Sequence, residues 1–138
     1  MKNTSFISKR NLAWLSRNHY DGLLTVCKIR RSLRYGIANT SIKAFILEEF
    51  KSHLQPHLIV EEEWLFPKLP GENHLRIHAE KQHAELRSMV KDFCDSPDLN
   101  LSLPEEFANL LEEHIRFEER TLFPFIEKQM NENELNNK

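Results

Sequence analysis

The sequence has few of the residues that stabilise small secreted proteins or metal–thiolate sites. Its 138 residues include only two cysteines and three glycines. Cys27 and Cys94 are too few and too far apart for a disulfide framework or a zinc–thiolate site. The scarcity of glycine argues against a turn-rich β fold and, together with a 40% hydrophobic content, favours helices.

An excess of charge of one sign is also lacking. The 19 basic and 21 acidic residues leave a formal net charge of −2, so no strong field attracts nucleic acid or an anionic membrane. No apolar run approaches the length of a membrane span, and none follows the basic residues near the N-terminus as a signal peptide requires. We therefore expect a cytoplasmic protein without a nucleic-acid or membrane partner.

Apolar residues recur at helical spacing in four segments, at about residues 11–35, 40–69, 73–94 and 104–130. The short connections between these segments predict an all-α fold, an antiparallel up-down-up-down four-helix bundle. We expect residues 11–130 to form this domain. The segments 1–10 and 131–138 are polar, and we expect a flexible lead-in and a flexible tail there, with the last helix ending near Met130.

One motif occurs twice, as HLIVEEEWLFP at residues 57–67 and HIRFEERTLFP at residues 114–124. Both copies fit the template H-x-x-x-E-E-x-x-L-F-P. Residues four apart share one face of a helix, so each copy presents an imidazole and a carboxylate side by side. Two such pairs facing a bundle core would suit a dinuclear metal site. We interpret the L-F-P ends as elements of packing and helix geometry, and we expect Pro56 to kink or break the second helix just before His57.

Counting residues from the connections places the candidate ligands at one height in the bundle, because each residue of a helix rises by about 1.5 Å. The six residues of this layer are His19, His57, Glu61, His83, His114 and Glu118. Carboxylates facing an apolar core are costly unless they are paired, so either a metal or a pair of buried salt bridges must accompany them. We expect Glu62 and Glu119 to point to solvent or to contact the ligands from outside.

Two more histidines lie close to this layer in the sequence. We expect His53 to face the core one turn before His57, where it would contact the site or serve in packing. His78 is a candidate fifth imidazole ligand. Imidazoles and carboxylates without thiolates suit iron or manganese better than structural zinc.

The segments SRNHYDGLL, HLIVEEEWLFPKL, EKQHAELRSMV and EEHIRFEERTLFPFIE, in this order, resemble a small hemerythrin-like (HHE cation-binding) domain. The resemblance implies two non-haem iron ions (Fe2+/Fe3+) with an oxo or hydroxo bridge. It also implies terminal ligands His19, His57, His83 and His114 and bridging carboxylates Glu61 and Glu118. Oxygen-carrying hemerythrins have two histidines four apart on the third helix and a His-x4-Asp on the fourth. Here Arg87 follows His83 at that spacing, and the fourth helix carries His-x3-Glu.

The missing fifth histidine bears on function. Four imidazoles, two bidentate carboxylates and one bridge fill about ten of the roughly twelve positions of two octahedral irons. One open position would remain on each iron. We therefore expect a non-haem di-iron protein that binds O2, NO or peroxide in sensing or stress response. A sensor of this kind could act on a protein partner, which the sequence does not identify. The alternatives are a di-iron enzyme for NO or peroxide turnover or iron-centre repair, and iron sensing or storage.

Overall fold

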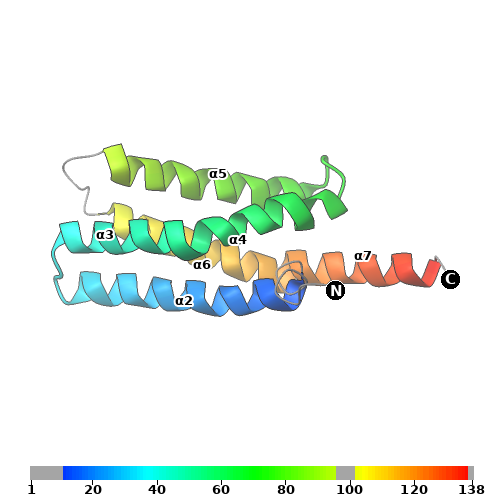
Figure 1. Cartoon of the computed structure of the whole chain (residues 1–138), viewed down its shortest axis with the longest axis horizontal. Coiled ribbons are helices and arrows are strands. Elements are labelled where there is room, and N and C mark those ends of the chain that lie inside the picture. The colour runs from blue at the N-terminus through cyan, green and yellow to red at the C-terminus, as the bar shows by residue number, and fades with distance from the viewer. Residues whose placement is uncertain (1–10, 96–101, 137–138) are drawn as a thin grey trace, which may run out of the picture.

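The computed structural model describes residues 11–95 and 102–136, and every regular element within these ranges is helical. The elements form four rods (Figure 1). The first rod is α2 (Leu12–Arg34), and the third is α5 (His74–Asp95). The second consists of α3 (Asn39–Glu49), η1 (Phe50–Leu54), α4 (Gln55–Val60), η2 (Glu61–Leu65) and η3 (Phe66–Lys68). The fourth consists of α6 (Leu103–Phe117), η4 (Glu118–Leu122) and α7 (Phe123–Asn136).

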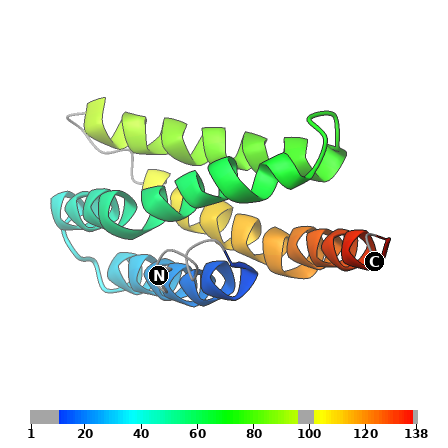
Figure 2. The ribbon, with the colours of Figure 1, turned by 45° about the vertical axis from the view of Figure 1, so that its right-hand side comes forward.

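The four rods lie alongside one another (Figures 1 and 2). The first and second rods meet at one end of the bundle, and the second and third meet at the opposite end (Figure 1). α6 packs against both α2 and α5, whereas α7 extends beyond the ends of the other rods. None of the helices in the described ranges combines the length and the apolar character that a membrane crossing requires.

Asparagine side chains cap the first and third rods. The Asn11 side chain accepts a hydrogen bond from the backbone N–H of Ala13 at 2.6 Å. Asn73 accepts from the N–H groups of Leu75 and Arg76 at 2.9 and 3.2 Å. Such caps satisfy backbone donors that have no partner inside the helix. Both rods therefore begin within a residue of the starts predicted from the sequence.

The end of the fourth rod differs from the prediction. α7 continues to Asn136, so the expected helix end near Met130 is wrong. The reason lies in the residues that follow Met130, which include neither glycine nor proline to stop a helix. An apolar stripe marks where a helix is buried, and a helix can continue past that point where no residue breaks it.

Three π-helical turns interrupt the second and fourth rods. In each turn a backbone N–H donates to the carbonyl five residues before it: Gln55 to Phe50, Phe66 to Glu61, and Phe123 to Glu118. A proline follows each of these donor residues directly, at Pro56, Pro67 and Pro124. Proline has no N–H and its ring collides with the carbonyl four residues earlier in an α-helix, so the wider turn accommodates it. Instead of a break before His57, the second rod continues through a π turn at Phe50–Leu54, and the two L-F-P ends also follow π turns.

The apolar core consists of two clusters with a polar layer between them. On α2, Leu15 belongs to one cluster and Val26 to the other, and the buried His19 lies between them. The fourth rod repeats the arrangement, with Leu111 and Leu122 in the two clusters on either side of the motif's histidine and glutamate. The polar layer is thus enclosed by hydrocarbon at both ends, which keeps water away from its charged groups.

Candidate metal centre

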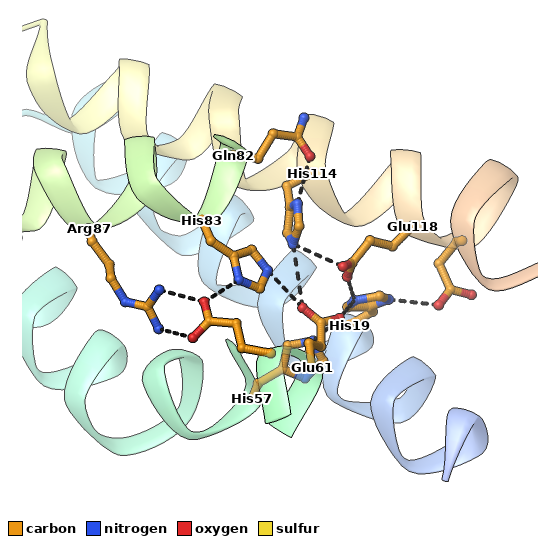
Figure 3. Close-up of polar contacts among 10 residues, drawn as sticks. His19, His57, Glu61, Gln82, His83, Arg87, His114 and Glu118 are labelled. Carbon is orange, nitrogen blue, oxygen red and sulfur yellow. Dashed lines mark hydrogen bonds and ion pairs between the residues drawn. The ribbon is translucent and has the colours of Figure 1, made fainter. Parts of the chain in front are cut away.

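The structure brings all six candidate residues together in this layer, and each is at most 4% exposed. They are His19 from α2, His57 and Glu61 from the second rod, His83 from α5, and His114 and Glu118 from the fourth rod (Figure 3). Both glutamates are completely buried. All four rods therefore contribute to one cluster of imidazoles and carboxylates.

The two glutamates lie at the centre of the cluster, and every histidine directs its Nε2 atom toward them (Figure 3). Glu61 Oε2 lies 3.1 Å from His57 Nε2, and Glu61 Oε1 lies 2.9 Å from His83 Nε2. Glu118 lies 2.8 Å from His19 Nε2 and 3.3 Å from His114 Nε2. Each carboxylate is thus shared between imidazoles from different rods, which is the arrangement expected of a bridging ligand.

The outer nitrogens of His83 and His19 are each held by the carboxylate of a second acid. His83 Nδ1–H donates to Glu62 at 2.6 Å, and His19 Nδ1–H donates to Glu119 at 2.7 Å. Glu62 and Glu119 are the second acids of the two motif copies, so the expectation that they contact the ligands from outside is confirmed. A carboxylate on the outer nitrogen fixes the tautomer and the orientation of a metal-binding histidine.

The donor atoms form two groups that share both glutamates. One group comprises His19, His57, Glu61 and Glu118, and the other comprises Glu61, His83, His114 and Glu118. Within each group the four ligand atoms lie within 4.8 Å of one another. Two cations held in this way would each have two imidazoles and a part of both carboxylates. This set of nitrogen and oxygen donors suits iron or manganese.

Two buried polar atoms test whether the residues fit a cation. His114 Nε2 and Glu118 Oε2 are buried inside the cluster and lie 3.3 Å apart as an ion pair, but neither atom has a well-aligned hydrogen bond in the described structure. A buried ion pair without a well-aligned hydrogen bond compensates poorly for the desolvation of its charges. A cation between the two atoms would satisfy both. The residues therefore fit a cation, which would replace this poorly aligned ion pair.

The electrostatics of the cluster raise imidazole pKa values and lower a carboxyl pKa. Burial alone would lower the pKa of His19, but hydrogen bonds to Glu118 and Glu119 and nearby negative charge raise it to about 9. Burial also opposes the charge on His114, whose pKa the carboxylates of Glu118 and Glu61 nevertheless raise to about 10. The pKa of Glu61 would be raised by burial, but the charge of His57 and several hydrogen bonds hold it well below its ordinary value. Without metal, His19 and His114 therefore hold a proton at neutral pH.

Two of the predicted residues lie outside the cluster. The side chain of His53 is 67% exposed and pairs with Glu49 at 3.0 Å, so the expectation that it faces the core is wrong. The π turn at 50–54 changes the rotation of the helix between His53 and His57, and a count of four residues therefore does not put them on one face. His78 is exposed, and its ring packs against the ring of Phe117 with the two ring centroids 4.5 Å apart. It belongs to neither ligand group.

A cavity of about 60 Å³ lies beside the cluster. His19, His57 and His114 line it on the side of the glutamates, and its walls are mainly apolar, including Phe107, Leu111 and Ile115. Asp21, Glu49 and His53 line the side toward solvent. A single water needs about 10–15 Å³ of such space, so this cavity is large enough for a diatomic molecule.

A comparison with known protein families agrees with this geometry. The profile of the hemerythrin HHE cation-binding domain matches residues 24–126, which is most of the chain. The chain belongs to the hemerythrin family. The matched range of this hemerythrin-like domain begins after His19, so it is the structure, and not the profile, that brings His19 to the cluster. Searches of curated proteins and of solved structures find no significant match.

The sequence did not predict two side chains that support the histidines of this hemerythrin-like domain. Gln82 is 3% exposed and accepts a hydrogen bond from His114 Nδ1–H at 2.7 Å. Arg87 contacts Glu62 through two nitrogens, at 2.5 and 3.0 Å. In the sequence, Arg87 stands out only as the residue at the spacing where oxygen-carrying hemerythrins have a histidine. Its position one turn after His83 was the available signal, because residues at this spacing share a helix face.

Proposed function

We propose that this hemerythrin-like chain is a non-haem di-iron protein that binds O2, NO or peroxide, in sensing or stress response. One iron ion would be held by His19 and His57 and the other by His83 and His114, with Glu61 and Glu118 bridging them beside an oxo or hydroxo group. The observation that carries the proposal is that two groups of ligand atoms share both buried glutamates. The antiparallel up-down-up-down topology proposed for the bundle is supported by rods that meet at alternate ends (Figure 1).

When bound, the iron pair would supply electrons and Lewis acidity toward a small ligand. The chain's own residues perform the other tasks. The imidazole rings and the two glutamates fix the relative positions of the cations, and the flanking apolar clusters exclude water. The cavity wall of Phe107, Leu111 and Ile115 is apolar, which favours a neutral diatomic such as O2 or NO over an anion.

The number of histidines supports a reactive or sensing role over oxygen storage. Among the described residues four imidazoles belong to the ligand groups, and neither His53 nor His78 adds a fifth. An open position on each iron follows from this count. Peroxide or NO turnover remains the alternative, and a cytoplasmic location remains a prediction.

The function is tested by mixing the anaerobically reduced, iron-loaded protein with O2 or NO in a stopped-flow spectrometer. We expect the visible spectrum to change with one or two equivalents of ligand per iron pair, since each iron has an open position, and to revert when the ligand is removed. Consumption of many equivalents would instead establish the enzyme alternative. An unchanged spectrum with both gases would contradict any role in diatomic binding.

Gly22 offers a variant that narrows the cavity without touching a ligand. A methyl group at Gly22 would lie 2.7 Å from Ile115 Cδ1, and both residues line the cavity. We therefore expect Gly22→Ala to slow the spectral change with O2 or NO several-fold at unchanged iron content. Ile115 Cδ1 must move to admit the methyl group, and the helical preference for alanine over glycine, up to about 1 kcal/mol, offsets part of that cost. Gly71→Ala is the matched control, because a methyl group there meets nothing within 4 Å.

A further inference from the structure

The two halves of the metal cluster correspond residue by residue, but their supports differ. His19 on the first rod corresponds to His83 on the third, because each directs Nε2 to the first acid and Nδ1 to the second acid of one motif copy. His57 and His114 correspond as the first residues of the two copies. This internal repeat allows each support to be compared with its counterpart.

The half that contains His83 and His114 is held at both imidazoles. Glu62, which orients His83, accepts hydrogen bonds from two nitrogens of Arg87. Arg87 Nε in turn donates to the side chain of Gln55 at 3.1 Å. These contacts tie the second rod to α5 (Figure 3). His114 is oriented by Gln82, which is itself buried.

The half that contains His19 and His57 is held more loosely. Glu119, which orients His19, has a side chain that is 41% exposed, and its other hydrogen bond comes from the Ser16 hydroxyl at 2.7 Å. His57 Nδ1 is buried and has no partner in the described structure. Asn18 precedes His19 as Gln82 precedes His83, but its amide donates to the Trp14 carbonyl at 2.9 Å instead of supporting a histidine.

From this asymmetry we propose that the two cation positions are unequal, and that Arg87 and Gln82 are the positioning residues responsible. The position at His83 and His114 fills first and holds its ion more tightly, and the position at His19 and His57 is the exchangeable one. The inference rests on the proposed dinuclear metal centre. Its physical basis is that imidazoles already fixed in the metal-free protein lose less conformational freedom when they bind an ion.

A half-loaded protein follows from this order of filling. At free metal concentrations between the two dissociation constants, the chain would carry one ion at His83 and His114. The position at His19 and His57 would stay empty. Chemistry that needs both ions would then depend on metal supply.

The experiment is an anaerobic titration of the full-length metal-free protein with Co2+, followed by calorimetry and visible absorption. We expect two binding phases at least about 10-fold apart in affinity. Arg87→Met should weaken the tighter phase by up to the roughly 10–100-fold typical when the support of a ligating histidine is lost, because it releases Glu62, which orients His83, and it should leave the weaker phase unchanged. Gln82→Leu should also weaken the tighter phase, because it removes the hydrogen bond that orients His114. Ser16→Ala, the matched control in the looser half, should leave the tighter phase unchanged.

Ligand variants identify the positions. His19→Ala should retain the tighter phase, and His83→Ala should lose it. Thermal melting of each metal-free variant separates positioning from folding, because a general loss of structure would weaken both phases together. Two equal phases, or a tighter phase insensitive to both Arg87→Met and Gln82→Leu, would overturn the inference while leaving the dinuclear centre intact. Failure to bind Co2+ or Fe2+ at all would instead overturn the proposed function.

Discussion

Replacing Glu61 with glutamine is expected to abolish the binding of the metal pair. Glu61 is completely buried and its carboxylate belongs to both ligand groups. An amide keeps the shape of the side chain but removes the negative charge and one acceptor oxygen. Both cations lose a ligand at once, so the loss of affinity should exceed the roughly 10–100-fold that removal of a ligand's outer support typically causes.

Metal content after iron loading, measured by elemental analysis, checks this expectation. Glu63→Gln is the matched control, because Glu63 lies two residues along the same helical turn, is exposed and belongs to neither group. We expect the control to retain the metal content of the parent chain and Glu61→Gln to retain at most one weakly held ion. Two tightly bound ions in Glu61→Gln would exclude a bridging role for this carboxylate.

The second large effect concerns pH. In the metal-free protein the carboxylates raise the pKa of His19 to about 9 and that of His114 to about 10, although burial opposes both shifts. A histidine with a raised pKa stabilises the folded state fully below its unfolded pKa of about 6.5, and this contribution is lost as pH rises through the folded value. The pKa of Glu61 is lowered, so its contribution is lost on acidification. We therefore expect the metal-free protein to lose stability between about pH 6.5 and 10.

Metal binding should show the opposite dependence on pH. An ion that binds Nε2 must displace the proton that His19 or His114 holds at neutral pH. One proton displaced per ion implies that apparent affinity rises about 10-fold per pH unit in the range where the imidazole is protonated. Titrations with Co2+ at pH 6.5, 7.5 and 8.5 measure this slope. A flat profile would mean that the two imidazoles are neutral in the metal-free protein or are not ligands.

The convergence of the site could be predicted from the sequence because of the repeated motif. The spacing of His57 and Glu61, repeated at His114 and Glu118, fixed which side chains share a face, and residue counts along the helices brought His19 and His83 to the same height. The structure brings all six together. Burial then follows, because the layer lies between two apolar clusters that the same helical spacing also predicts.

Other features depend on geometry that a count of residues at 3.6 per turn does not capture. The π turn before Pro56 changes the helix rotation, and this places His53 in solvent, paired with Glu49. The role of Gln82 depends on its being buried between rods, which its polarity does not suggest. The asymmetry between Glu62 and Glu119 is also absent from the motif, because it arises from Arg87 on a different rod.

The central claim is that four imidazoles and two shared carboxylates hold a pair of iron ions. The most direct measurement is the iron content of the purified full-length protein, taken together with its ultraviolet–visible spectrum. We predict two iron ions per chain, one for each group of ligand atoms, with the charge-transfer bands of an oxo-bridged pair. A chain that binds no iron, or a single ion without such bands after anaerobic loading with excess Fe2+ and exposure to air, would contradict the claim.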